Sequence, residues 1–286
     1  MHYETLTAKY GLGEARAIYE LVMERRFGLS RTDILLGKDT TLSADDKAEL
    51  QIIFRRIAKG EPVQYVLGCE EFCGRMFLVG PGVLVPRPET QQLVQLVEQN
   101  VAPDSRVLDV GTGSGCIAIT LALAGYRVTA FDVSNEALDY ARRNAERLGA
   151  EVEFRIEDIR TPQSPLGGEY GQGNQPSSEG ERRVHAIVSN PPYICRKEAA
   201  EMDENVIMHE PHLALFVPDD DPLLFYRAIA DYGQQYLTDA GWLFFEVNRA
   251  YARQVGELLR QKGYIDIKIV KDQYDNERFV TCRMGD

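Results

Sequence analysis

The chain has 286 residues, with 32 Lys and Arg against 44 Asp and Glu, so its net charge is −12 with neutral histidines. Hydrophobic residues at 44% and charged residues at 27% are typical of a globular protein with a sizeable core, which excludes a fibrous or wholly disordered chain. The acidic balance also argues against a long nucleic acid as the partner, because phosphate backbones are bound by Lys and Arg.

The composition favours a cytoplasmic setting. No run approaches the roughly 18 apolar residues of a membrane span, and the first residues lack the basic and then apolar pattern of a secretion signal. The five cysteines are odd in number and widely scattered, which argues against a disulfide framework and for a reducing compartment. We therefore expect a cytoplasmic monomer that does not associate with membranes.

The first 60 residues are predicted to be helical, and no strand pattern interrupts them. One mixed apolar pattern covers residues 5–27. A second helix can be capped by Ser43 and places its apolar residues on one face, at Leu50, Ile53, Phe54 and Ile57.

Gly and Pro become frequent over residues 61–88, which indicates a connecting segment. Its short apolar pieces, Met76–Val79 and Val83–Val85, predict a hairpin. We therefore divide the chain into a helical domain, a hairpin linker and a larger domain, over residues 1–72, 73–88 and 89–286.

From residue 90 onward the predicted elements alternate. Strands are expected at Arg106–Val110, Arg127–Asp132, Val152–Ile156, Ala186–Val188 and Trp242–Val247. Helices are expected at Gln91–Gln99, Cys116–Ala124, between a Ser134 cap and Gly149, near 222–237 and at 249–262. Two closing strands are expected at Tyr264–Val270 and Arg278–Arg283. Strands separated by helices imply an α/β fold with a doubly wound parallel sheet.

Residues 161–183 are rich in Gly, Pro and Ser, so we expect a flexible surface loop there.

A glycine-rich motif, Asp109-Val-Gly-Thr-Gly-Ser-Gly115, joins a predicted strand to a predicted helix. Its alternating glycines let the backbone bend and admit a ligand closer than any Cβ would permit, and the following helix presents free N–H groups. A dinucleotide pyrophosphate and the amino-acid and ribose part of S-adenosylmethionine both fit. The third glycine comes one residue earlier than in the dinucleotide fingerprint, and Asp109 suits an ammonium group better than phosphates. Both features favour S-adenosylmethionine over a dinucleotide. A structural glycine-rich turn without a ligand is the alternative interpretation.

Two further carboxylates follow the next strands. Asp132 ends its strand, where a carboxylate can accept both hydroxyls of a ribose. Asp158 comes after Val152–Ile156 and is a weaker candidate, for the amino group of an adenine. A solvated loop carboxylate is the alternative interpretation of Asp158.

The second motif, Asn190-Pro-Pro-Tyr193, directly follows a predicted strand. Its prolines remove two backbone donors, which leaves carbonyl oxygens without a local N–H. Together with the Asn190 side-chain oxygen they present two acceptors to a planar –NH2 group, against which Tyr193 can stack. Catalysis would come mainly from positioning that nitrogen, and a proton-abstracting base is not required because the N-methylated cation is strongly acidic. A rigid turn is the alternative.

These two motifs, with Gly-Glu-Pro-Val-Gln-Tyr-Val-Leu-Gly at 60–68 and Pro-Arg-Pro-Glu-Thr at 86–90, resemble one family. Over nearly its whole length the chain is similar to the protein-(glutamine-N5) methyltransferases that modify peptide chain release factors. The resemblance implies a class I S-adenosylmethionine-dependent methyltransferase fold, which is Rossmann-like with a seven-stranded sheet, and a small N-terminal helical domain that docks the substrate. It implies S-adenosylmethionine as the methyl donor, with S-adenosylhomocysteine as the product. The implied substrate is the glutamine of the Gly-Gly-Gln loop in class I release factors.

The family's functional residues carry over by position. The cofactor would be held by Asp109, Gly111, Thr112, Gly113, Ser114, Gly115, Asp132, Asp158, Ile159 and Asn190. The glutamine amide would be held by the catalytic motif, Asn190, Pro191, Pro192 and Tyr193. The mouth of the substrate pocket would be lined by Arg87, Pro88 and Glu89.

The chain departs from the family's pattern after its Trp242–Phe245 strand. The family continues with Glu, any residue, Gly, and a Gln three further on, whereas this chain reads Glu246-Val-Asn248-Arg-Ala-Tyr251. Because Asn tolerates a left-handed backbone better than most residues, we expect the turn to survive at Asn248.

Two other functions remain as alternatives. A DNA or RNA adenine-amino methyltransferase shares the Asn-Pro-Pro-Tyr motif, but it needs a basic groove that the acidic chain does not suggest. A non-catalytic binding module would not need both motifs intact. No metal site is expected, because the His209-x-x-His212 pair has no third ligand in view and Cys69 and Cys73 lack the spacing of a zinc site.

Overall fold

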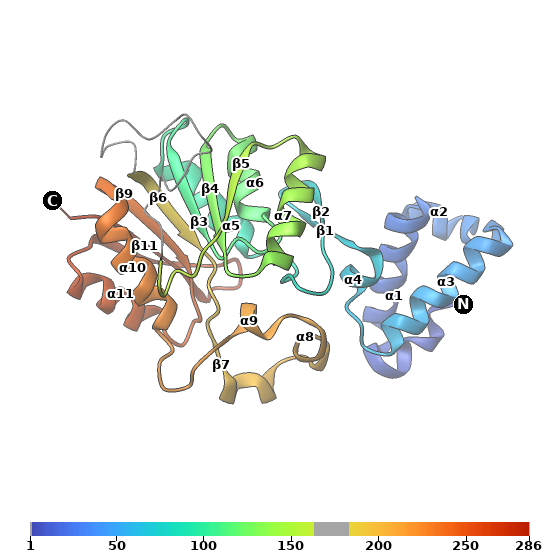
Figure 1. Cartoon of the computed structure of the whole chain (residues 1–286). Helices are drawn as coiled ribbons and strands as arrows, with labels where there is room; N and C mark the ends of the chain where they lie inside the picture. The colour runs from blue at the N-terminus through green and yellow to red at the C-terminus, as the bar shows by residue number, and fades with distance from the viewer. Residues whose placement is uncertain (1, 163–182, 286) are drawn as a thin grey trace.

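The computed structural model describes residues 2–162 and 183–285 (Figure 1). The loop expected at 161–183 therefore lies almost wholly outside the described residues. Figure 1 shows a helical N-terminal region that stands to one side of an α/β domain, with a small hairpin between them. Within the described ranges, every helix is too short or too polar to cross a membrane.

The N-terminal region is helical, as the sequence predicts. Its elements are η1 (His2–Thr5), α1 (Thr7–Phe27), α2 (Arg31–Leu35), η2 (Lys38–Thr41), α3 (Ala44–Ala58) and α4 (Val63–Leu67). Ser43 begins α3 by accepting a hydrogen bond from the Asp46 N–H at 3.1 Å. The apolar face of α3 then packs on α1 in one buried cluster, which contains the four predicted residues Leu50, Ile53, Phe54 and Ile57.

The hairpin lies in a different place from the predicted one. Strand β1 (Cys69–Phe72) pairs antiparallel with β2 (Arg75–Leu78), so Met76–Val79 pairs with the residues before it and not with Val83–Val85. The turn is Cys73-Gly74, and both residues have positive φ, as a two-residue hairpin turn requires. Cys is an unusual residue for that backbone, which is why the turn was not predicted.

The central sheet has seven strands, in the order β10-β11-β9-β6-β3-β4-β5. In that order they span Ile265–Lys271, Glu277–Arg283, Leu237–Glu246, Val184–Ser189, Arg106–Val110, Arg127–Asp132 and Val152–Ile156. The five strands from β9 to β5 are parallel, as expected from strands separated by helices. The expectation of a parallel sheet is wrong for β11, which pairs antiparallel with both β9 and β10, whereas β10 runs in the same direction as the other five strands. A short turn joins β10 to β11, and such a turn can only reverse the chain.

Helices cover both faces of the sheet, because successive strand residues point to opposite sides. Ile187 and Phe245 pack in one buried cluster with α10 and α11, whereas their neighbours Val188 and Phe244 pack in another with α5 and α6. The helices span α5 (Thr90–Asn100), α6 (Cys116–Leu123), α7 (Asn135–Leu148), α10 (Leu224–Tyr236) and α11 (Ala252–Gln261). The doubly wound architecture predicted from the sequence is confirmed.

The sheet brings the two sequence motifs together. The chain runs outward from β3 to β4 and β5, and then returns to place β6 on the other side of β3. Val110, at the end of β3, pairs with Ser189, at the end of β6, and the Ser189 hydroxyl donates to the Val110 carbonyl at 2.6 Å. In open α/β sheets, ligands bind beyond the carboxyl ends of the strands at such a reversal of strand order.

A segment that the sequence did not resolve into elements leaves the end of β6. It contains β7 (Ile194–Cys195), η4 (Arg196–Glu201), α8 (Glu204–His209), α9 (His212–Leu215) and β8 (Phe216–Val217). Each of these elements is six residues or shorter. Such short pieces show no periodicity, which explains why they were not predicted. In Figure 1, α8 and α9 lie below the sheet.

Gly115 allows α6 and α7 to pack closely, and we expect its replacement to lower the free energy of unfolding. Gly115 has a φ of +82°, and a Cβ there would lie 2.8 Å from Ile119 Cδ1 and 3.1 Å from Ala141 Cβ. Gly149 has a similar φ of +71° with no atom within 4 Å of its Cβ position, so it is the matched control. Gly149→Ala should lower the free energy of unfolding by about 1 kcal/mol from backbone strain, and Gly115→Ala by about 3 kcal/mol because overpacking is added. Urea unfolding measures both, and equal losses would show that packing at Gly115 is unimportant.

Candidate functional site

The glycine-rich motif forms a tight loop between β3 and α6. The N–H groups of Gly111 and Thr112 both donate to the Phe131 carbonyl at 2.9 Å, and the Gly115 N–H donates to the Thr112 carbonyl. These bonds tie the loop to the end of β4. The loop backbone therefore forms part of the wall of a cavity at the carboxyl ends of the strands, through Gly111 and Gly113.

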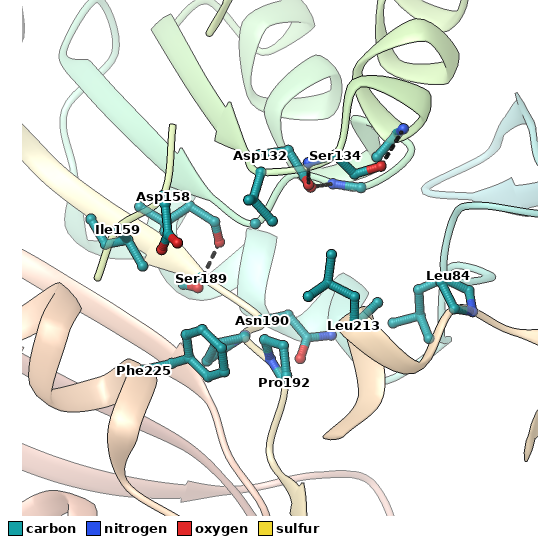
Figure 2. A pocket seen from close by; sticks show the side chains of 18 of the residues that line it. Leu84, Asp132, Ser134, Asp158, Ile159, Ser189, Asn190, Pro192, Leu213 and Phe225 are labelled. Atoms are coloured by element: carbon teal, nitrogen blue, oxygen red, sulfur yellow. Dashed lines mark hydrogen bonds between the residues drawn. The ribbon is translucent and has the colours of Figure 1, made fainter. Parts of the chain in front are cut away.

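This first cavity brings several predicted residues together (Figure 2). Its lining includes Gly111, Gly113, Asp132, Asp158, Ile159, Asn190, Pro191 and Pro192. The other motif residues lie behind the wall: the side chains of Asp109, Thr112 and Ser114 are buried, and Gly115 packs against α7. The motif therefore has a cavity-facing half and a supporting half.

Asp132 is held in a fixed orientation at the end of β4. Its Oδ2 accepts from the Gly113 N–H and its Oδ1 from the Ser134 N–H, each at 2.9 Å. Burial raises the pKa of the Asp132 carboxyl, and the backbone donors oppose that effect. Because each carboxylate oxygen has a second lone pair, Asp132 can still accept two hydroxyls from the cavity. Beside it, Val133 exposes 44% of its surface and adds an apolar wall.

Asp158 and Ile159 follow β5, the strand next to β4, and lie at the left of the cavity in Figure 2, across from Leu84. Asp158 Oδ2 lies 2.6 Å from a guanidinium nitrogen of Arg160, and this ion pair lowers the pKa of the Asp158 carboxyl. The Arg160 guanidinium also lies over the Phe225 ring, 5.9 Å from its centre. Ile159 is buried and belongs to the core cluster of α10 and α11. This side of the cavity therefore combines the apolar surface of Ile159 and Phe225 with two carboxylates, Glu157 and Asp158.

Asp109, which we expected beside a ligand ammonium group, lies instead beneath the loop. Its side chain is fully buried, and its Oδ2 accepts from the Thr112 hydroxyl at 2.7 Å. Oδ1 has no hydrogen-bond partner among the described residues. Burial raises the pKa of the Asp109 carboxyl to about 7.

The Asn190-Pro-Pro-Tyr193 motif separates the first cavity from a second one. Asn190 and Pro191 line both cavities, Pro192 lines the first, and Tyr193 lines the second. Arg87 also lines the second cavity. The other two residues expected at its mouth, Pro88 and Glu89, line a separate hollow against α5 and the β10–β11 turn.

Hydrogen bonds link the motif to a buried carboxylate. The Asn190 amide donates to the Thr90 hydroxyl at 3.3 Å, and the Thr90 hydroxyl donates to Glu246 Oε2 at 2.7 Å. The Tyr193 hydroxyl donates to Glu246 Oε1 at 3.2 Å. Burial raises the pKa of the Glu246 carboxyl and also that of the Tyr193 hydroxyl. Sequence reasoning gave no role to Thr90 or Glu246, although both lie within motifs that it singled out.

Glu210 is a third buried carboxylate, and the sequence placed it only in a loop. Its Oε2 accepts from the Val85 N–H at 3.1 Å, and its Oε1 from the Arg87 guanidinium at 2.7 Å. Glu210 therefore ties the α8–α9 segment to the linker and fixes Arg87 at the second cavity. The neighbouring His212 is engaged locally, with its Nε2 2.9 Å from the Ile207 carbonyl.

Asn248 stabilises its turn through its side chain, and the expected left-handed backbone is wrong, since its φ is negative. Its amide donates to the Tyr193 carbonyl at 3.3 Å and to Glu198 Oε1 at 3.1 Å. Its Oδ1 accepts from the Ala250 N–H at 3.0 Å. At the position of the family's Gln, the Tyr251 hydroxyl lies 3.4 Å from the Cys195 sulfur.

Comparison with known proteins gives two matching family models. The model described as PrmC N-terminal domain matches residues 2–68, and the one described as methyltransferase domain matches residues 107–168. A solved structure, a methyltransferase from Pyrococcus furiosus, is 18% identical with a TM-score of 0.50, and the match covers 85% of this chain and all of that one. This likeness concerns the fold alone.

Two curated relatives match almost the whole chain. The release factor glutamine methyltransferase of Bacteroides thetaiotaomicron is 43% identical over 281 residues, which cover 98% of this chain and 96% of the relative. The release factor glutamine methyltransferase of Flavobacterium psychrophilum is 34% identical over 284 residues, which cover 97% and 94%.

The buried Asp109 carboxyl predicts a specific pH dependence of stability. Its pKa is raised from 3.8 to about 7 in the folded chain, so the folded state holds the proton more tightly than the unfolded state. Ionisation therefore penalises folding increasingly as the pH rises from about 4 to about 7. The full penalty, present above that range, is on the order of 4 kcal/mol.

Asp109→Asn removes this ionisation and keeps an oxygen for the Thr112 hydroxyl. We compare the free energies of unfolding as the variant minus the wild type. This difference should increase by up to about 4 kcal/mol as the pH rises from about 4 to about 8. Urea unfolding at constant ionic strength measures the difference. A difference that is independent of pH would contradict the assignment.

Proposed function

The chain belongs to the release factor glutamine methyltransferases, and we propose that it methylates the glutamine of the Gly-Gly-Gln motif in class I peptide chain release factors. The methyl group is transferred from S-adenosylmethionine to the side-chain amide nitrogen, and S-adenosylhomocysteine is the second product. The observation that carries this proposal is the shared wall of Asn190 and Pro191 between the two cavities. A donor in the first cavity and an amide in the second meet at this wall.

The first cavity fits S-adenosylmethionine by the chemistry of its lining. Asp132 offers two oriented oxygens for ribose hydroxyls, and Val133 and Ile159 offer apolar surface for the adenine ring. The backbone of Gly111 and Gly113 lines the same wall without side chains, which leaves room for the amino-acid end of the cofactor. Asp158 is the candidate for the adenine amino group. When bound, S-adenosylmethionine supplies an electrophilic methyl group.

The second motif holds the substrate amide in this proposal. The Asn190 side-chain oxygen and the Pro191 backbone carbonyl accept the two N–H groups of the glutamine, so its nitrogen is aimed at the first cavity. Tyr193, fixed by its hydroxyl bond to Glu246, provides an aromatic wall for the amide plane. The nitrogen forms the new N–C bond and then loses one proton to solvent, so no side chain is assigned as a base. Catalysis rests on positioning.

The N-terminal region is assigned to docking of the release factor. Several large apolar side chains are exposed on it: Leu12, Leu35, Leu36 and Ile52. The region contacts the segment beside the second cavity, because the Asn205 amide of α8 donates to the Tyr10 hydroxyl at 3.2 Å. A docked protein can therefore place a loop near that cavity. We assign the protein to the cytoplasm as a monomer that does not bind nucleic acid directly.

We expect methyl transfer to depend on the Asn190 acceptor. Asn190→Ala should lower the turnover number by about 100-fold, because a positioned polar group at a reacting centre contributes that order of rate. The dissociation constant for S-adenosylmethionine should change far less. Tritium transfer from labelled cofactor measures the first quantity and calorimetry the second. Asn100→Ala, at the exposed end of α5, is the control, and full activity of Asn190→Ala would remove the acceptor role.

Substrate choice separates the proposal from an adenine-amino methyltransferase. Purified class I release factor should gain one methyl group on its Gly-Gly-Gln glutamine, detected by peptide mass spectrometry. Duplex DNA and RNA under the same conditions should gain none. Methylation of the nucleic acid and not of the release factor would reverse the assignment.

A further inference from the structure

We propose that Thr90 and Glu246 position the acceptor oxygen of Asn190, with the Thr90 hydroxyl as the relay between the carboxylate and the amide. The inference rests on the proposed function of Asn190. Thr90 is the first residue of α5, Glu246 is the last residue of β9, and Asn190 follows β6. Three separate elements therefore converge on one chain of hydrogen bonds.

The relay is enclosed by protein. Thr90 and Glu246 each expose only 2% of their surface. The Thr90 hydroxyl lies 2.7 Å from Glu246 Oε2 and 3.3 Å from the Asn190 amide nitrogen. Because water is excluded there, each group depends on its protein partners.

The chemistry of the groups fixes the direction of every bond. A carboxylate only accepts hydrogen bonds, so the single proton of the Thr90 hydroxyl is committed to Glu246. The hydroxyl oxygen can then only accept, which requires Asn190 to present its –NH2 group. The Asn190 carbonyl oxygen consequently points away from Thr90, where it is free to accept from a ligand amide. Without the carboxylate, the hydroxyl can donate to Asn190 and the amide can flip.

Glu246 acts on both polar side chains of the motif. Its Oε1 accepts from the Tyr193 hydroxyl, while its Oε2 acts on Asn190 through Thr90. Burial raises the pKa of Glu246, and the nearby Arg278 guanidinium favours its charged form. A buried carboxylate stabilises a fold less well than a packed apolar side chain would. The presence of Glu246 at this buried position, where an apolar side chain would stabilise the fold better, is consistent with a role in orienting the motif.

Two substitutions of Thr90 separate positioning from packing. Thr90→Val keeps the shape and removes the hydroxyl, whereas Thr90→Ser keeps the hydroxyl and removes a methyl group. We expect Thr90→Val to lower the turnover number at least about tenfold, since small misplacements at a reacting centre have large effects on rate. Thr90→Ser should stay within about twofold of the wild type, and neither should change cofactor affinity by more than about twofold. Thr129→Val is the matched control, because the Thr129 hydroxyl also donates to a glutamate, Glu153, but in an exposed hydrogen bond.

A double-mutant cycle shows whether Thr90 acts through Asn190. In the Asn190→Ala background, Thr90→Val should cause no further loss of turnover, because no acceptor remains to be oriented. Glu246→Gln, whose amide can donate as well as accept, should also lower the turnover number, and in the Asn190→Ala background its effect should shrink to the part that acts through Tyr193. If Thr90→Val folds poorly in thermal unfolding, the relay is tested by whether the loss caused by Glu246→Gln is smaller in the Asn190→Ala background than in the wild type; equal losses in the two backgrounds would contradict it.

The outcomes distinguish this inference from the proposed function. If the wild type does not methylate release factors, the proposed function fails. Two results would instead contradict the relay while the proposed function stands. One is equal turnover of Thr90→Val and Thr90→Ser; the other is a loss of turnover from Thr90→Val that is as large in Asn190→Ala as in the wild type.

Discussion

The site depends on the pairing of β3 with β6. Val110 and Ser189 are 79 residues apart in the chain, yet they are direct partners in the sheet, and the Ser189 hydroxyl bonds to the Val110 carbonyl. The glycine-rich loop leaves one strand and the Asn-Pro-Pro-Tyr motif leaves the other. Because both strands are central and parallel, their carboxyl ends cannot move apart without breaking the sheet. The cofactor cavity and the amide cavity therefore share a wall.

Polar groups buried under this wall perform the positioning. Asp109 supports the glycine loop from below, Glu246 acts on the second motif, and Glu210 fixes Arg87 and the linker. All three carboxylates are buried, and each accepts at least one hydrogen bond from a neighbouring segment. A side chain that only packs would hold the chain but not the direction of its polar atoms. Directional bonds are needed where a nitrogen must be aimed at a methyl group.

The sequence predicts the sheet well because the relevant signals are local. The strands Arg106–Val110, Arg127–Asp132 and Val152–Ile156 agree with the structure to the residue, and Ser134 and Gly149 cap α7 as predicted. The long-range bonds could not be predicted in this way. Thr90 and Glu246 are 156 residues apart, and no pattern within one sequence pairs them. The motifs thus identify the site, whereas the carboxylates that orient it emerge only from the fold.

The Asn248 turn shows how a departure from the family's pattern fits the same site. A glycine at this position can supply only backbone freedom, which this turn does not use, because Asn248 has a negative φ. The Asn248 side chain instead bonds to the Tyr193 carbonyl and to Glu198, so it attaches the turn to the segment that follows the motif. Glu246, two residues earlier, bonds to the hydroxyl of the same tyrosine. Tyr193 is therefore held at both its backbone and its hydroxyl by one short stretch of chain, and the aromatic wall of the amide cavity keeps its place.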